Sequence, residues 1–178
     1  MQTIRELKKT IAELRRENTA FRQRLATVAR LEPFAPASAE YQIARLIGGT
    51  LTDGLAAHDM VCARGKKFEV KFSRINAGTI YSKRWSWGHP LGAGGAKVFH
   101  RLILVGEIDA RYASRYFDPK SPYVIFDVPF AAVKRLMRKD PIIQINTNPE
   151  PMSSSAAMLL FERYQITRRD LKARYKVA

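Results

Sequence analysis

The N-terminal segment carries apolar side chains at a seven-residue period. The positions that follow this period, at alternating spacings of three and four, are Ile4, Leu7, Ile11, Leu14, Asn18, Phe21, Leu25 and Val28. Such spacing is typical of a coiled coil. With Ile4 as position a, isoleucine at a and leucine at d favour a parallel dimer. Asn18 falls at an a position, where its amide pairs best with its own copy and fixes the register. We therefore expect residues 1–31 to form a coiled-coil dimerisation helix.

Two prolines mark the end of this segment. Pro33 and Pro36 cannot donate a backbone hydrogen bond and restrain the residues before them, so a helix ends there. Residues 32–37 are expected to form a short connector, followed by one main domain over residues 38–178. The alternative is that the N-terminal segment is an amphipathic helix that folds back on this domain.

The pattern then changes from helical to strand-like. A helix is expected to begin at Ser38 as its N-cap and to end at the glycine pair 48–49, where glycine adopts the left-handed conformation. Residues 59–63 are mostly apolar, and residues 67–73 alternate between polar and apolar side chains at a period of two. Because the turn-forming residues 64–66 lie between them, the sequence predicts a β-hairpin.

The remainder of the chain adds strands and helices. These are strands at 102–105 and 123–126, helices at 131–139 and 154–165, and a last basic helix capped by Thr167. The stretch 85–95 is rich in glycine and aromatic residues, which is typical of a mobile surface loop. Helices and strands together predict a fold of the α/β or α+β class.

Composition narrows the classes of function. The 178 residues include 31 Lys and Arg against 16 Asp and Glu, a formal net charge of +15, and 46% of them are hydrophobic. Because this charge attracts polyanions, nucleic acid is the leading partner, with an anionic membrane surface or ribosomal RNA as alternatives. The single cysteine, Cys62, excludes an intrachain disulfide and a cysteine zinc cage. No long apolar run and no signal-peptide pattern occurs, so we expect a cytoplasmic protein without a membrane partner.

The hairpin carries the most informative chemistry. Glu69 and Lys71 are two residues apart on one strand, so their side chains share one face, and the tight turn brings that face towards Asp59. Two carboxylates and an amine at one sheet edge suit a hard cation such as Mg²⁺ with a lysine beside a metal-bound water. The alternative to a metal site is that the face with Glu69 and Lys71 is simply solvated. The apolar side chains Phe68 and Val70 lie on the opposite face.

Asp59 followed by Glu69-Val70-Lys71 resembles the PD-(D/E)xK nuclease signature. Type II restriction endonucleases, some junction resolvases and other DNA hydrolases share this active site, and the spacing is similar to that of small dimeric restriction enzymes. The resemblance covers roughly residues 38–127 and implies a restriction-endonuclease-like core, a mixed β-sheet flanked by helices. His58 departs from the pattern, because many members have proline there.

The resemblance also implies roles for individual residues. Asp59 and Glu69 would ligate Mg²⁺, or Mn²⁺ as a substitute, with the backbone carbonyl of Val70 as a further ligand. Lys71 would orient or help to deprotonate the attacking water. Glu40 matches an acidic residue that many members place near the metal, although Asp53 competes for that role. The implied activity is site-specific hydrolysis of double-stranded DNA by a homodimer or a dimer of dimers, which leaves 5′-phosphates.

Several residues after the hairpin are candidates for DNA contact. Polar and aromatic side chains of these types contact DNA backbones and base edges. The candidates are Ser73, Arg74, Asn76, Lys83, Arg84, Trp85, Trp87 and His89. Lys97 and Tyr81 belong to the same interleaved basic and aromatic stretch. The aromatic residues could equally anchor their loop to the core.

Two other classes of function compete with the restriction-type nuclease. One is a structure-specific DNA nuclease of the junction-resolvase or repair type. The other is a non-enzymatic dimeric coiled-coil DNA-binding protein, in which residues 157–175 form a helix-turn-helix-like reader with Ile166 and Thr167 in the turn. An RNA-binding role is a weaker option, because the sequence has no RNP-type or KH-type motif.

Overall fold

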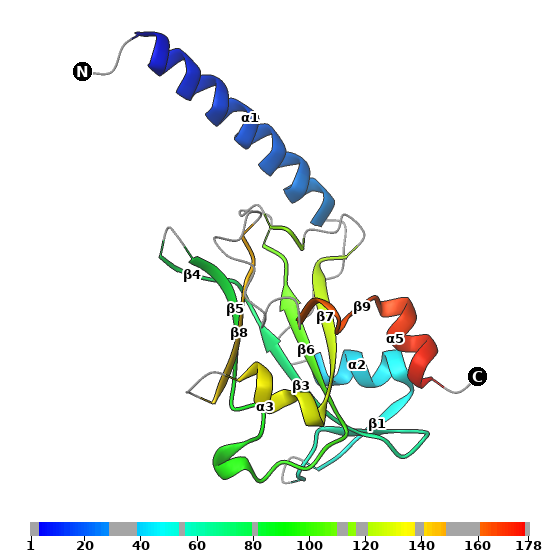
Figure 1. Ribbon diagram of the computed structural model, residues 1–178. Helices are drawn as coiled ribbons and strands as arrows, with labels where there is room; N and C mark the ends of the chain where they lie inside the picture. The colour runs from blue at the N-terminus through cyan, green and yellow to red at the C-terminus, as the bar shows by residue number, and fades with distance from the viewer. Residues whose placement is uncertain are drawn as a thin grey trace.

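The computed structural model describes residues 4–28, 39–53, 56–79, 82–109, 114–116, 121–137, 141–148 and 161–176, and the structural statements below concern these residues. The elements (Figure 1) are α1 (Ile4–Val28), α2 (Ala39–Ile47), β1 (Gly49–Leu51), β2 (Met60–Cys62), β3 (Lys67–Ser73), β4 (Asn76–Thr79), β5 (Ser82–Gly88), the 3-10 helix η2 (Ala93–Gly95), β6 (Arg101–Glu107), β7 (Tyr123–Pro129), α3 (Phe130–Leu136), β8 (Ile142–Asn146), β9 (Gln165–Ile166) and α5 (Arg168–Tyr175).

Two sheets organise the fold. The main sheet is mixed and six-stranded, in the order β1-β2-β3-β6-β7-β9, and the second sheet has the order β4-β5-β8. Strands β3 and β6 run parallel, whereas the other neighbours in the main sheet are antiparallel. Strands β6 and β7 are buried along nearly their whole length. Their near-continuous apolar runs therefore fit a central position covered on both faces.

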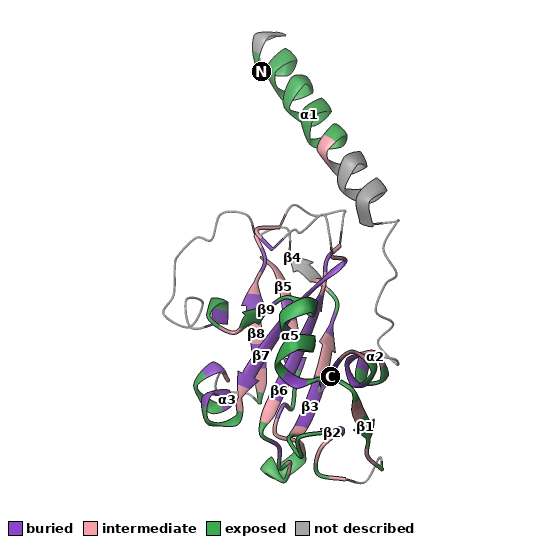
Figure 2. Ribbon diagram, turned by 90° about the vertical axis from the view of Figure 1, so that its right-hand side faces the viewer, coloured by how far each residue is buried: buried purple, intermediate pink, exposed green. Residues whose placement is uncertain are grey.

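The two faces of the main sheet meet different layers. Ile103 and Val105 of β6 belong to the core cluster that includes α2 and α5. Leu102 and Leu104 of the same strand belong to the cluster that includes β5, β8 and α3. Alternate residues of a strand point to opposite faces, so β6 contributes to both cores. Figures 1 and 2 show α2 and α5 on one side of the main sheet, away from the second sheet and α3.

The locally coded elements are confirmed. The hairpin pairs β2 with β3, Gly65 adopts a φ of 71° in its turn, and β3 spans residues 67–73 as expected. Helix α2 ends at Ile47, and Gly48 follows with a φ of 66°. Thr167 caps α5, because its hydroxyl accepts a hydrogen bond from the backbone N–H of Asp170 at 3.1 Å. These elements establish a mixed α/β protein of the expected broad class.

The expected mobile loop at 85–95 is wrong over its first part. Residues 82–88 form strand β5, in which Trp85 and Trp87 are 0% and 1% exposed. Their indole N–H groups donate to the backbone carbonyls of Glu107 at 2.8 Å and Val105 at 3.0 Å. A side chain on Gly106 would overlap the ring of Trp85, so the glycine makes room for it. The tryptophans are core residues of the second sheet.

Two other expectations need correction. Gln165 does not end a helix, because Gln165 and Ile166 form β9 and Ile166 pairs with Ile125 of β7. The alternating polar face of β3 is not solvated, because Glu69 and Ser73 are buried as well as Phe68. Strands β1, β4 and β8 were not anticipated. The connector 32–37, Ser38 and residues 154–160 lie outside the described residues. Helix α3 ends at Leu136, short of the expected residue 139, because Met137 has an extended backbone and forms a β-bridge with Ile143.

Helix α1 follows the expected heptad segment. Its side chains from Glu6 to Thr19 are exposed, including Leu7 at 46%, Ile11 at 48% and Leu14 at 57%. From Glu6 to Thr19 the apolar stripe is therefore not buried against the main domain, and the fold-back alternative is wrong for residues 6–19. The side chains of residues 21–28 lie outside the described ones. Residues 1–3 and 29–31 lie outside the described residues.

Candidate active site

The hairpin holds Asp59 in a fixed position at the start of β2. The backbone N–H of Asp59 donates to the carbonyl of Phe68 at 2.9 Å, which extends the β2–β3 ladder by one residue. The Asp59 Oδ2 atom accepts a hydrogen bond from the backbone N–H of Val70 at 2.7 Å. Thr52 holds the backbone on the side away from β3: its N–H donates to the Asp59 carbonyl, and its hydroxyl donates to the His58 carbonyl. These hydrogen bonds tie Asp59 to β3 on one side and to Thr52 on the other.

Glu69 lies in the middle of the main sheet. It occupies β3 opposite Leu102 of β6, and its side chain is 0% exposed. Burial raises the pKa of Glu69, the contacts with Lys71 and Lys97 lower it, and the pKa stays above its ordinary value. A carboxylate buried this deeply costs several kcal/mol unless cations compensate it.

Two lysines supply that compensation. Lys71 Nζ lies 2.8 Å from Glu69 Oε1, an ion pair whose alignment falls short of a hydrogen bond. Lys97 Nζ donates to Glu69 Oε2 at 2.7 Å and to Asp59 Oδ1 at 3.2 Å. Each oxygen of Glu69 thus faces its own ammonium group, and Asp59 shares one of them. The structure brings Asp59, Glu69 and Lys71 together, as the motif predicted.

Lys97 was expected near DNA, and its contact with the acidic pair was not anticipated. It lies on the segment between β5 and β6, where its N–H donates to the Leu91 carbonyl at 3.0 Å. Burial lowers the pKa of Lys97, but the hydrogen bond to Glu69 and the charge of Asp59 outweigh burial, so the pKa is raised. No local sequence signal marks this role, because it depends on how a loop returns to the hairpin 28 residues away.

Glu40 is the third acid of this region. It lies in the first turn of α2 and is exposed. Burial raises the pKa of Glu40, the charge of Asp59 raises it further, and Lys71 and Lys97 lower it. Glu40 is therefore within electrostatic range of the cluster. No group of three or more His, Cys, Asp or Glu side chains could hold a metal ion among the described residues, so Glu40 is not placed as a third ligand.

The donor set nevertheless suits a hard cation. Asp59 Oδ1 and Glu69 Oε2 converge on a single positive group, the ammonium of Lys97. Mg²⁺ is commonly held by one or two carboxylates while it keeps several waters. Two converging carboxylates, with the backbone carbonyl of Val70 beside them in sequence, therefore fit this metal. Neither histidine nor cysteine is needed for such a site.

Three of the expected DNA contacts are wrong in this fold. Trp85 and Trp87 are in the core, as described above. Ser73 is 7% exposed, and its hydroxyl accepts from the Ser86 N–H at 2.9 Å and donates to the Arg74 carbonyl at 2.9 Å. These side chains are therefore turned inward and cannot meet DNA at the surface.

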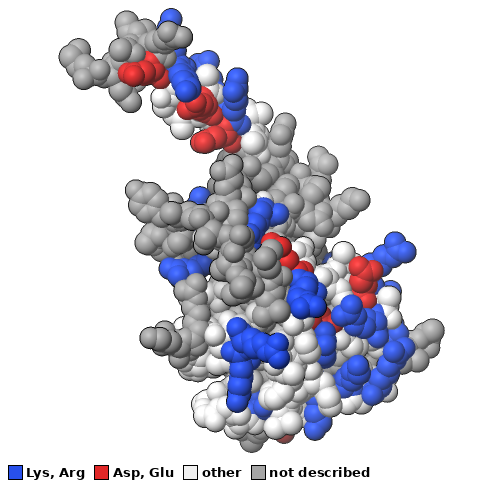
Figure 3. Space-filling view, in the orientation of Figure 1, with Lys and Arg blue, Asp and Glu red and all other residues white. Residues whose placement is uncertain are grey.

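The other DNA candidates remain predictions. Arg74 is exposed and lies 3.3 Å from Glu107, and Arg84 donates to Gln144 at 3.4 Å. His89 is exposed with a φ of 47°, and Lys83 is half-buried on β5. Asn76 is on β4, but its side chain lies outside the described residues. Figure 3 shows many more Lys and Arg than Asp and Glu side chains on the face drawn there.

Residues 161–176, the described part of the C-terminal region, do not form the expected helix-turn-helix. Ile166 pairs with β7 in the main sheet, so the segment before α5 is a strand end and not a turn between helices. Helix α5 buries Leu171 and Tyr175 against the main sheet and leaves its remaining side chains exposed. The helix-turn-helix interpretation is wrong, although α5 remains a basic surface.

No protein-family model matches the chain, and no curated protein sequence matches it. None of the helices that the structure describes combines the length and apolar character needed to cross a membrane.

Proposed function

We propose that this protein is a Mg²⁺-dependent endonuclease that cuts double-stranded DNA and leaves 5′-phosphates, with a site-specific, restriction-type activity. One observation carries the proposal. Asp59, Glu69 and Lys71 meet at a β-hairpin in a mixed sheet, and Glu69 is ionisable, fully buried and in contact with two lysines. Two carboxylates that converge on one position, with a lysine beside them, form a donor set for a hydrated Mg²⁺ ion and its attacking water.

Each residue has a defined task in the proposed reaction. Asp59 and Glu69, with the Val70 carbonyl, would hold the divalent cation. Lys71, whose ammonium already lies beside Glu69, would orient the attacking water by donating a hydrogen bond to it, or in its neutral amine form would accept a proton from it. The bound cation supplies stabilisation of the charge that develops on the phosphate and lowers the pKa of its water. Glu40 would add negative charge near the cluster.

The charge distribution supports an acid cluster that acts on DNA. Residues 32–178 contain 23 Lys and Arg against 13 Asp and Glu, so 23 − 13 gives +10 for this part of the chain. Such a charge attracts the DNA backbone over long distances. The Asp59–Glu69 pair would repel a phosphate locally unless a cation lies between them. A basic surface with a cation-holding acidic pair is therefore self-consistent.

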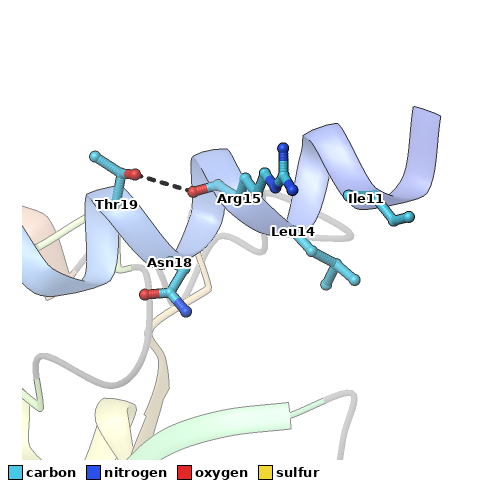
Figure 4. Close-up of a pocket in the computed structure, with 5 residues that line it drawn as sticks. All are labelled: Ile11, Leu14, Arg15, Asn18 and Thr19. Carbon is cyan, nitrogen blue, oxygen red and sulfur yellow. Dashed lines mark hydrogen bonds between the residues drawn. The ribbon is translucent and has the colours of Figure 1, made fainter. Parts of the chain in front are cut away.

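Helix α1 supports a dimeric enzyme. Figure 4 shows the shallow pocket lined by Ile11, Leu14, Arg15, Asn18 and Thr19, with Ile11, Leu14 and Asn18 on the same side of the helix. Their exposed apolar seam suits a second copy of this chain in a parallel coiled coil. Two-fold symmetry would place one cleavage centre on each DNA strand of a palindromic site.

Cleavage of plasmid DNA tests the proposed function. The protein is incubated with plasmid and Mg²⁺, alongside a sample with EDTA and a Lys71→Ala variant. Discrete fragments that are absent from both controls support the proposal, and their ends give the site and the stagger. Intact DNA across a broad set of linear, circular and branched substrates would overturn it. Cleavage of branched substrates alone, without sequence preference, would assign the structure-specific class.

A further inference from the structure

We propose that Lys97 is a built-in competitor for the divalent cation: its ammonium occupies the position between Asp59 and Glu69, and the cation binds there only as Lys97 withdraws. This inference rests on the proposed function, because it takes the cation of that function as the competing ligand. It assigns to Lys97 control over the binding of the cation, a role that the motif does not contain.

The contacts define a shared position. Lys97 Nζ is 2.7 Å from Glu69 Oε2 and 3.2 Å from Asp59 Oδ1, so one positive group joins carboxylates from the two strands of the hairpin. A divalent cation on the same oxygens would sit at about 2.1 Å from each of them. The ammonium and the cation would then be close like charges in a partly buried site, where repulsion is poorly screened. The two cannot share these oxygens in the present arrangement.

Lys71 differs from Lys97 in this respect. Its Nζ contacts Glu69 Oε1, the other oxygen of that carboxylate. Lys71 comes from β3, a central strand of the main sheet, whereas Lys97 comes from a surface segment. Lys71 can therefore remain in place when the cation binds, while Lys97 has to move.

The segment that carries Lys97 is built for such movement. Gly92, Gly94 and Gly95 have φ values of 74°, 67° and 74°, and η2 contains no buried residue. Glycine adopts these conformations without strain and leaves the backbone adaptable. The Lys97 side chain is 25% exposed, so its flexible stem has a path to solvent. Withdrawal therefore requires rotation of one long side chain and not disruption of the sheet.

Gly92 also provides the space that the aliphatic part of the Lys97 side chain occupies. A Cβ atom on Gly92 would lie 2.7 Å from Lys97 Cγ, so this close approach needs a glycine. The backbone beyond Lys97 is anchored, because the Val98 N–H donates to the Ala57 carbonyl at 2.9 Å. Together these contacts direct the ammonium towards the acidic pair.

Calorimetric titration of the full chain with Mn²⁺ tests the proposal without an activity assay. The variants are Lys97→Met and, as a matched loss of one charge on an exposed helix position, Lys134→Met. We expect Lys97→Met to bind Mn²⁺ on the order of tenfold more tightly than the unaltered chain, because the competing charge is gone. Lys134→Met should bind like the unaltered chain. Asp59→Asn should abolish binding, which locates the ion at this pair.

The outcomes separate the two proposals. Equal Mn²⁺ affinity in the unaltered chain and Lys97→Met overturns the competition and leaves the nuclease proposal standing. Failure of both to bind Mn²⁺, with or without DNA, overturns both. If Lys97→Met does not fold, Lys97→Gln keeps hydrogen-bond donors without the charge and carries the same expectation.

Labelling of lysine amines supplies a second readout on the unaltered chain. Acetylation of Lys97, followed by mass spectrometry, should be slow at first and several-fold faster at saturating Mn²⁺, because the amine becomes exposed. Acetylation of Lys134 should not change. An unchanged or slower rate at Lys97 under saturating Mn²⁺ would overturn the withdrawal step.

Discussion

The hydroxyl of Tyr175 donates a hydrogen bond to Asp127 Oδ2 at 2.8 Å and thereby joins the last helix to strand β7 of the main sheet. Asp127 is 1% exposed and also accepts from Arg101 Nε at 2.6 Å and from Arg174 at 2.7 Å. This buried carboxylate holds α5 over the sheet that contains Glu69. It is a structural counterpart of the candidate active site, because both of its side-chain oxygens accept hydrogen bonds from side chains of β6 and α5.

Replacement of Asp127 should destabilise the fold strongly. In Asp127→Asn the Arg101 guanidinium, whose side chain is 20% exposed, keeps its charge and loses its counter-ion. Breaking a buried pair in this way costs about 3–5 kcal/mol. We expect urea denaturation to show a decrease of that size in the free energy of unfolding. Asp170→Asn, at an exposed position of α5, is the control and should cost about 1 kcal/mol or less. Equal stability of Asp127→Asn and the unaltered chain would contradict this assignment.

The raised pKa of Tyr175 predicts that the folded state loses stability at alkaline pH. Burial, followed by the charge of Asp127, raises the pKa of Tyr175 to about 12, whereas an unfolded tyrosine titrates near 10. The folded chain therefore holds this proton where the unfolded chain has released it, and stability falls as pH rises from about 10 to about 12. The decrease is up to about 2–3 kcal/mol. Unfolding curves of Tyr175→Phe should lack this component, and an identical pH slope in the two proteins would refute it.

The elements whose sequence signals lie close together along the chain were predicted correctly. The hairpin was predicted because its alternation, Gly65 and the flanking apolar residues all lie within fifteen positions. The role of Trp85 stayed open between DNA contact and an anchor in the core, because the room for its ring comes from Gly106 on another strand. Strand β9 has two residues and is defined by pairing with β7, so no local pattern marks it.

The residues of the candidate site likewise fall into those that a local motif predicted and those that depend on contacts between distant segments. Asp59, Glu69 and Lys71 were identified because the motif lies on one hairpin. Lys97 was assigned elsewhere, because its contact with Glu69 arises only when the segment between β5 and β6 folds back. The burial of Glu69 was also unforeseen, because alternation alone does not show whether the second face of a strand is covered by other elements.

Lys71 should separate catalysis from binding. Lys71→Met removes the ammonium beside Glu69 Oε1 and leaves the contacts of Lys97 with the acidic pair in place. Under the proposed function, the single-turnover rate of DNA cleavage should fall by about 10²–10⁴-fold, as for loss of a proton-transfer group. DNA affinity, measured by fluorescence anisotropy with Ca²⁺, should change little. A rate within twofold of the unaltered enzyme would exclude a catalytic role for Lys71.

Trp87 should matter for stability and not for DNA affinity. It is 1% exposed and packs on Phe126 and Phe161, with ring centroids 6.1 Å from each. Trp87→Ala would leave a large cavity and remove the indole hydrogen bond to the Val105 carbonyl, with a cost of about 3–5 kcal/mol. Thermal unfolding measures this cost. Trp87→Phe should retain the fold with a smaller loss, and its DNA affinity should equal that of the unaltered chain. A selective loss of DNA affinity in folded Trp87→Phe would restore the surface role.

The seam of α1 predicts a change of oligomeric state. Leu14 occupies a d position and is 57% exposed, so a second copy would bury it in a parallel coiled coil. Leu14→Glu places like charges opposite each other in that seam, and we expect light scattering to show a monomer where the unaltered chain is a dimer. Ala12→Glu adds the same charge at position b, outside the seam, and should remain dimeric. Under the proposed function, the Leu14→Glu monomer should nick plasmid DNA in place of cutting both strands, because each chain carries one centre. A monomeric unaltered chain, or a dimeric Leu14→Glu variant, would show that this seam does not form the dimer.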